Sequence, residues 1–251
     1  MAGFEIVSPV DMQVIARRGY ANEAVIDQAI RAAEDAFPVW AALDIEQRLG
    51  LVDRFVAEME MRREQLADLV TVQMGRPRPQ ADEMGRLRLV TDHTKEIARA
   101  VLSPSANEVG DGITRYVTRD PVGPCLSICA WNYPVAMLAS LVVLPLIAGN
   151  VVLLKHAPQT ALIGDIVNEA AAAAGLPSGA VRAIDMTHAD CEAAIASGRF
   201  PIVQFIGSTR GGRQVATSAG MGMARAGLEL GGSDPAYIRA DAPLESIAGD
   251  L

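Results

Sequence analysis

The stretch from Pro121 to His156, PVGPCLSICAWNYPVAMLASLVVLPLIAGNVVLLKH, contains three apolar runs separated by short polar breaks. The first run, Cys125 to Ala130, and the last, Val151 to Leu154, are short and bounded by Gly, Pro or Asn, which is typical of buried parallel strands. The middle run, Val135 to Ala148, is long enough for a helix and apolar nearly all round, so we expect it to be covered on all sides. The stretch therefore predicts a strand, a helix and a second strand.

Such a βαβ unit aligns the carboxyl ends of both strands along one edge, where open α/β sheets bind ligands. Trp131 and Asn132 follow the first strand and Lys155 ends the second. Taken singly, Asn132-Tyr133-Pro134 is better explained as a turn and Lys155 as a solvated strand end. A membrane span would need about 20 uninterrupted apolar residues, and the polar breaks exclude one here.

The composition indicates an α/β protein that binds small molecules. The chain has 251 residues, of which half are hydrophobic and few are aromatic, and its formal net charge of −8 argues against a nucleic-acid or anionic-membrane partner. Three cysteines, Cys125, Cys129 and Cys191, are too few for a disulfide framework, so a reducing, cytoplasmic location is expected. The first residues carry no secretory signal pattern.

The N-terminal third predicts a small β-hairpin followed by helices. The two strands are Phe4 to Val7 and Gln13 to Ala16. Three helices are expected after them: Glu23 to Phe37 with Asn22 as its N-cap, a helix from Asp44 to about Met74, and Ala81 to Val101, whose mixed charges predict a solvated face.

A polar loop, Ser103 to Gly112, should then precede a strand that lies outside the main core. That strand, Ile113 to Arg119, alternates apolar and polar residues. Such a protruding strand pairs either with a partner subunit or with its own domain, and the sequence leaves both open.

The C-terminal half continues the alternation of strands and helices. Strands are expected at Val181 to Asp185, Ile202 to Ile206 and Ala226 to Leu230, with helices at Thr160 to Ala174, at Asp190 to Ser197 and up to about Met223. Gly207 to Gly212 forms a Gly-rich turn between strand and helix, which suits a phosphate but is equally a tight connection that needs small residues. The expected fold is one doubly wound, Rossmann-like parallel sheet with helices on both faces and a small protruding strand or hairpin.

Four polar side chains lie in or just beyond predicted strand ends of this sheet: Asn132, Lys155, Ser208 and Glu229. An amide, an ammonium, a phosphate-type turn and a carboxylate along one edge predict a dinucleotide site with chemistry beside it. The short-chain dehydrogenases share such a sheet but need Tyr-x-x-x-Lys, and no tyrosine of this chain has lysine at that spacing.

The motifs PVGPCLSICAWNYP, AGNVVLLK, AAGLPSG, FIGSTRGG and LELGG occur in the order and spacing of the aldehyde dehydrogenase superfamily, which the whole chain resembles. The resemblance implies NAD(P)-dependent oxidation of an aldehyde to a carboxylic acid. It makes Asn132 the amide that holds the oxyanion and Glu229 the general base for deacylation. Lys155 would contact the adenosine ribose, Ser208 the pyrophosphate, and Trp131, Gly207, Gly211, Leu230 and Gly231 the remaining cofactor surface. No metal site is implied, and the strand at residues 113–123 resembles part of the family's oligomerisation hairpin, so a homo-oligomer is expected.

The sequence departs from the family pattern at the nucleophile. The family's cysteine lies a few dozen residues beyond the glutamate of LELGG, and the printed chain ends at Leu251 without a cysteine at a matching place. We therefore expect residues 1–251 to be the NAD(P)-binding domain without the catalytic domain, unable to oxidise aldehydes alone. The alternative is an inactive nucleotide-binding or subunit-binding module derived from the family.

A second departure concerns the cofactor. Where many members have Lys-Pro-Ser-Glu, this chain has Lys155-His156-Ala157-Pro158, so the acid that would grip the ribose diol is missing. Its absence removes repulsion toward a 2′-phosphate, so the expected cofactor is NAD or NADP. His156 could then contact the phosphate, although a structural role explains this histidine better. The same four residues resemble the succinate-semialdehyde branch of the family.

Overall fold

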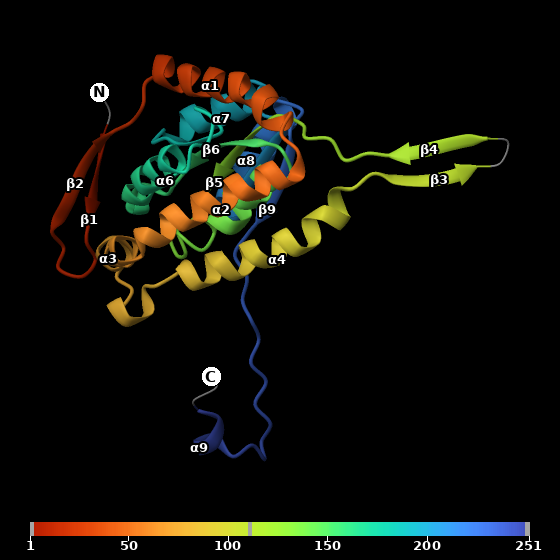
Figure 1. Ribbon diagram of the computed structural model, residues 1–251. Helices are drawn as coiled ribbons and strands as arrows, with labels where there is room; N and C mark the ends of the chain where they lie inside the picture. Colours follow the sequence, from red (N-terminus) through yellow and green to blue (C-terminus); the bar gives the residue numbers. More distant parts are fainter. Residues whose placement is uncertain (1–2, 110–111, 249–251) are drawn as a thin grey trace.

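The architecture of the molecule is shown by a computed structural model (Figure 1) that describes residues 3–109 and 112–248. Its central sheet has five parallel strands. In spatial order these are β7 (Val181–Ala183), β6 (Val151–Lys155), β5 (Pro124–Ile128), β8 (Ile202–Ile206) and β9 (Arg225–Glu229). The strand order reverses direction between β5 and β8, which is the switch point where doubly wound sheets bind dinucleotides. The predicted Rossmann-like fold is therefore confirmed.

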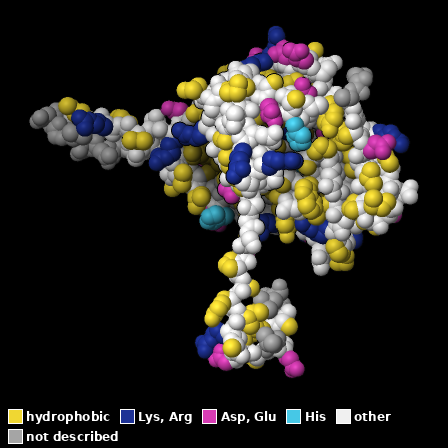
Figure 2. All heavy atoms as spheres, turned by 180° about the vertical axis from the view of Figure 1, so that it is seen from behind, with side chains coloured by type: hydrophobic (Ala, Val, Ile, Leu, Met, Phe, Trp, Pro, Cys, Tyr) yellow, Lys and Arg dark blue, Asp and Glu magenta, His cyan; other side chains and the backbone are white. Residues whose placement is uncertain are grey.

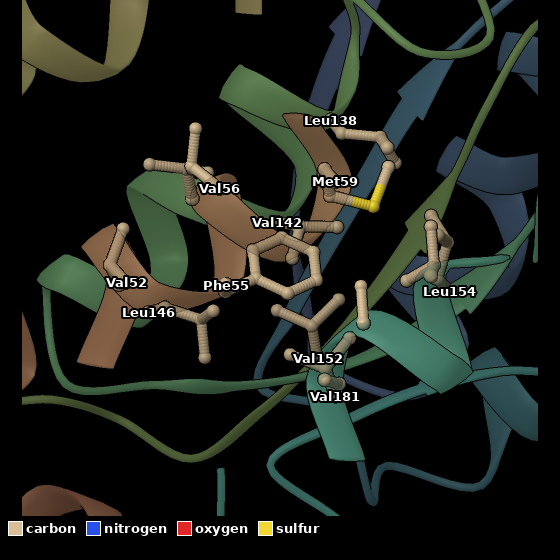
Figure 3. Close-up of a cluster of buried hydrophobic side chains, with 14 of the residues drawn as sticks. Val52, Phe55, Val56, Met59, Leu138, Val142, Leu146, Val152, Leu154 and Val181 are labelled. Atoms are coloured by element: carbon tan, nitrogen blue, oxygen red, sulfur yellow. The ribbon is translucent and has the colours of Figure 1, made fainter. Parts of the chain in front are cut away.

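Helices cover both faces of the sheet because successive strand residues point to opposite faces. Val152 and Leu154 of β6 pack with α2 (Ile45–Met61) and α6 (Leu162–Ala173), whereas Leu153 packs with α7 (His188–Ala196) and α8 (Thr209–Met221) on the other side. The long helix α1 (Glu23–Ala41) contributes to both clusters. Figure 3 shows the first cluster around Phe55, which is fully buried.

Local signals predicted the first two helices well. The Asn22 side chain accepts a hydrogen bond from Val25 N at 3.0 Å and starts α1. Asp44 and Gln47 form a capping box that starts α2. The predicted single helix up to Met74 is interrupted at Arg62, after which α3 (Arg63–Met74) ends at Gly75 in the left-handed conformation, φ 81°.

The apolar run after β5 is less regular than predicted. Residues 134–137 form turns, and residues 139–143 form a π-helical turn in which Leu144 N donates to Ala139 O. Only Leu138 and α5 (Leu144–Ile147) are α-helical within this run. The Ser127 hydroxyl of β5 donates to Leu141 O at 2.7 Å, which satisfies a carbonyl of this turn. Trp40 Nε1 donates to Leu146 O at 2.9 Å from the helical layer.

Two β-hairpins lie outside the main sheet. β1 (Gly3–Val7) pairs with β2 (Val14–Gly19), as predicted. β3 (Ser105–Val109) pairs with β4 (Ile113–Val117) and projects far from the body (Figures 1 and 2). The prediction of a polar loop over Ser103 to Gly112 was wrong for β3, because the polar residues of a two-sided hairpin follow no burial pattern; residues 110 and 111 lie outside the described residues.

The remaining helices are α4 (Met84–Leu102), which runs back towards the hairpin, and the short α9 (Leu244–Ile247). Residues 231–243 leave the body in an extended path after β9 (Figure 2). Among the described helices, none has the length and apolarity needed to cross a bilayer.

Candidate functional site

The predicted site residues meet at the carboxyl edge of the sheet. Ile128 of β5 is paired in register with Lys155 of β6, and Ile206 of β8 is paired with Glu229 of β9. The strands therefore end at one level on both sides of the switch point, and the loops that follow them face a common groove.

Two adjoining hollows of about 550 and 510 Å³ form this groove. They share several lining residues, including Lys155, Phe205 and Ser208. Eight of the nine residues singled out from the sequence line the first hollow: Trp131, Asn132, Lys155, Gly207, Ser208, Glu229, Leu230 and Gly231. The ninth, Gly211, lines the second hollow. The structure thus brings all of them to one groove.

Lys155 is the groove residue whose surroundings most strongly indicate a bound ligand. It is only 3% exposed, and within the described part of the chain its ammonium makes no hydrogen bond or ion pair. Burial lowers the pKa of Lys155, because removing the charge from water costs free energy that nearby groups such as Asp185 offset only in part. A buried, unpartnered cation that faces a cavity suits hydroxyl or phosphate oxygens of a ligand.

Ser208 begins α8 and remains able to bind a ligand. Its Oγ accepts a hydrogen bond from Gly211 N at 3.1 Å, which makes Ser208 the N-cap. Capping uses a lone pair of the hydroxyl and leaves its hydrogen free to donate towards the groove. The positive end of the helix adds to the attraction for a phosphate.

The glycines of the turn also have a packing role. A Cβ on Gly207 or on Gly211 would lie 2.6 or 2.7 Å from the Phe205 ring, and a Cβ on Gly212 would lie 2.4 Å from Leu230 Cδ2. The tight connection and the phosphate cradle are therefore compatible readings of the same turn, because both require the backbone to approach its neighbours closely.

Asn132 and Glu229 are exposed at the same groove. The Asn132 side-chain amide has no hydrogen-bond partner among the described residues, whereas its backbone carbonyl accepts from Arg76 Nη2 at 2.5 Å. An exposed amide with free N–H groups can bind a developing negative charge, and an exposed carboxylate can accept a proton from water.

Sequence reasoning missed Arg76 and Glu83. Glu83 belongs to the charged segment that was predicted to be solvated, but it is 5% exposed and forms an ion pair with Arg76 at 2.6 Å. No local pattern marks the pair, because its partners lie in the loop after β5, some fifty residues along the chain. Arg210, Glu192 and Gln214 also line the second hollow and were not singled out.

His156 does not reach the groove. Its ring is 3% exposed, its Nε2 lies 3.2 Å from Pro134 O, and burial lowers the pKa of His156 to about 4. Of the two roles considered, the burial of His156 and its contact with Pro134 O favour the structural one, and His156 does not line either hollow.

The three cysteines are buried thiols. Burial raises the pKa of Cys125 to about 12 and that of Cys191 to about 11, and it also raises the pKa of Cys129. Cys129 lines the groove but donates to Ala130 O at 3.3 Å. At neutral pH all three are protonated, and a protonated thiol is a poor nucleophile.

Comparison with known proteins gives a consistent result. The sequence model described as Aldehyde dehydrogenase family matches residues 2–250. The chain is 32% identical over 234 residues to geranial dehydrogenase from Castellaniella defragrans, covering 92% of this chain and 49% of that protein. It is also 32% identical over 240 residues to succinate-semialdehyde dehydrogenase [NADP(+)] from Deinococcus radiodurans, covering 94% and 49%.

Solved structures agree in fold. The crystal structure of PnpE in complex with nicotinamide adenine dinucleotide superposes with a TM-score of 0.84 at 28% identity, over 92% of this chain and 48% of that one. The chain spans about half the length of the curated relatives it matches.

Proposed function

Because the chain belongs to the aldehyde dehydrogenase family, we propose that the groove binds NAD or NADP and that the whole protein oxidises an aldehyde to a carboxylic acid. The observation that carries this proposal is the Lys155 ammonium, which is buried at the groove and makes no hydrogen bond or ion pair with the residues that the structure describes. The adenosine ribose would satisfy it. Ser208 and the first turn of α8 would hold the pyrophosphate, with Gly207 and Gly211 allowing its close approach.

The remaining site residues fit the other end of the cofactor. When bound, NAD(P) supplies the hydride acceptor. Trp131, Leu230 and Gly231 would border the nicotinamide end. Asn132 would donate to the oxyanion that forms when a thiolate attacks the aldehyde, and Glu229 would take a proton from the water that releases the acid.

The described cysteines do not supply that thiolate, since all three are buried and protonated. For residues 1–251 by themselves we therefore propose nucleotide binding without turnover. A derived module with a binding role alone makes the same prediction for this chain, and it differs in that no form of the whole protein would oxidise an aldehyde.

Of the two cofactors, we propose that NADP binds more tightly. Pro158 stands in the groove where many relatives carry a carboxylate, so nothing there repels a 2′-phosphate. Lys155 and Arg210 both line the second hollow and supply positive charge, which outweighs the single carboxylate of Glu192 there. Dissociation constants for NADP and NAD, measured by calorimetry, test this, and a preference for NAD overturns it.

The substrate and the assembly are finer proposals. The Lys155 to Pro158 segment resembles the succinate-semialdehyde branch, so we propose an aldehyde that carries a carboxylate; rates across aldehydes with and without an acid group test it. The β3–β4 hairpin would pair with another copy of the chain, because among the described strands β3 and β4 pair only with each other and Ile113, Tyr116 and Val117 are exposed. Sedimentation of Tyr116→Lys, which should shift to the monomer, tests this. The free thiols favour the cytoplasm as the location.

The proposed function as a whole is tested by titrating purified chain with NADPH while recording tryptophan fluorescence. Trp131 lines the groove and is 49% exposed, whereas Trp40 is fully buried. Saturable quenching that disappears in Trp131→Phe supports the groove as the binding site. Absence of saturable binding for both dinucleotides overturns it.

A further inference from the structure

The segment that carries Asn132 has little regular structure but is fixed at several points. Residues 131–137 form bends and turns after β5. At its start, Cys129 N donates to Lys155 O at 2.9 Å, and in its middle Pro134 O lies 3.2 Å from His156 Nε2. Both contacts are made by residues at the end of β6 or directly after it.

Glu83, at the start of α4, makes further contacts to the segment. Its Oε2 accepts hydrogen bonds from Val135 N at 2.9 Å and from Ala136 N at 2.8 Å, and its Oε1 accepts from Arg76 Nη1 at 2.6 Å. Both carboxylate oxygens are thus used. Burial raises the pKa of Glu83, because desolvation opposes the charge even though three donors stabilise it.

Arg76 extends the contact to Asn132 itself. Its Nη2 donates to Asn132 O at 2.5 Å, and its guanidinium carbon lies 4.1 Å from the centre of the Tyr133 ring. One arginine therefore holds the two residues that precede Pro134, while its ion-pair partner Glu83 holds the two that follow. A planar guanidinium with several donors can do this, whereas an ammonium lacks the fixed geometry.

We propose that Arg76 and Glu83 are positioning residues that aim the Asn132 amide into the groove. The role of Asn132 in this inference rests on the proposed function, whereas the contacts of Arg76 and Glu83 are observed in the structure. The pair fixes the backbone of residues 132–136 on both sides and leaves the Asn132 side chain free. A site that stabilises an oxyanion needs such a donor held in place before the charge develops, since reorganisation during the reaction would cancel the gain.

The test is hydrogen exchange at the Val135 and Ala136 backbone amides in purified protein that consists of residues 1–251. Glu83→Gln keeps the size of the side chain and removes the charge, so exchange at these two amides should accelerate by about 10-fold to 100-fold, the range for losing hydrogen bonds to a charged group. Glu34→Gln is the matched control, because Glu34 pairs with Arg199 at 2.6 Å far from this segment. It should leave the exchange unchanged.

Measurements of NADP affinity and of kcat distinguish a positioning role of Glu83 and Arg76 from a general role in stabilising the fold. NADP affinity of Glu83→Gln should stay within about twofold of the parent, because Lys155 and Ser208 are untouched. In whole protein that oxidises aldehydes, kcat should fall at least about 10-fold at constant KM for NADP. Arg76→Lys should recover part of the loss seen in Arg76→Ala, since charge returns without the fork geometry.

Two results would overturn the proposal: unchanged exchange at Val135 and Ala136 in Glu83→Gln, or faster exchange spread equally over β5 and β6, which would indicate loss of the fold rather than release of one segment. Failure of the parent chain to bind either dinucleotide would instead refute the proposed function and leave the exchange result interpretable.

Discussion

The two sides of the groove are built differently. On the β5–β6 side every strand residue is buried, and Lys155 at the end of β6 is 3% exposed. On the β9 side the strand alternates between exposed and half-buried positions, and Glu229 and Leu230 are exposed. The Lys155 end of the groove, where we propose that the adenosine binds, is therefore held in place by the hydrophobic core. The end that carries Glu229 instead lies on an open sheet edge.

Removing a core side chain should produce the largest contrast between the two sides. Leu154→Ala in β6 should lower the free energy of unfolding by about 3 kcal/mol, because Leu154 is fully buried and the site cannot collapse. Leu228→Ala in β9 should cost about 1 kcal/mol, since Leu228 is only half-buried. Urea denaturation measures both, and equal losses would break the comparison.

Acid should lower the free energy of unfolding through His156, which directly follows β6 on the buried side of the groove. The pKa of this residue is lowered from 6.5 to about 4 in the folded protein, so the unfolded chain binds the proton more readily between these values. Stability attributable to neutral His156 is present above about pH 6.5 and is lost as the pH falls to about 4, by about 3 kcal/mol in total. Unfolding measured across this range in His156→Gln should show a flatter pH dependence.

The control for that experiment is His93→Gln, because the His93 side chain is 68% exposed on α4. It should keep the slope of the parent chain. A slope that persists in His156→Gln would show that another group causes the acid sensitivity.

The two sides of the groove should also differ in how much they contribute to the affinity for NADP. Lys155→Met should weaken NADP binding by about 10-fold to 100-fold, because a charged hydrogen-bond donor is lost from a dry site. It should also stabilise the free chain, since it removes a buried ammonium that has no ion-pair partner between residues 3–109 and 112–248. Glu229→Gln, at the other side, should change the affinity less than about twofold. Calorimetric titration of the three proteins decides, and equal losses for both variants would contradict the division.

The smallest expected effect concerns the helix cap. Ser208→Ala should lower stability by about 1 kcal/mol and weaken NADP binding several-fold, because it removes both the cap and the free hydroxyl donor. Thr187→Ala is the matched control: the Thr187 hydroxyl caps α7 by accepting from Asp190 N at 3.1 Å. It should cost similar stability without loss of binding, and a loss of binding in both variants would make capping itself the cause.

The sequence predicted what local patterns and chain order determine. The caps at Asn22 and Asp44 predicted where the first two helices begin. The order of the apolar runs and the Gly-rich turn predicted the parallel sheet, with Lys155, Ser208 and Glu229 at its edge. Long-range contacts were not predictable in this way. Glu83 resembled a solvated helix residue, and only the fold shows that it caps the backbone of a distant loop.

Backbone irregularity was equally hidden. The run from Val135 to Ala148 has the composition of a helix, but the structure divides it into turns, a π turn and one short α-helix. Hydrophobicity indicates that such a run is buried and does not specify its hydrogen-bond register.

The π turn at residues 139–143 sets a limit on protein engineering. It holds one residue more than an α-helical turn would, and Leu144 N donates to Ala139 O across it. Deleting a single residue there would replace this i→i+5 hydrogen bond by the i→i+4 pattern of an α-helix, and the carbonyls and side chains of the turn would change their directions. Anyone transplanting this groove into another scaffold must therefore preserve the number of residues between Pro134 and Leu144 as strictly as their identities.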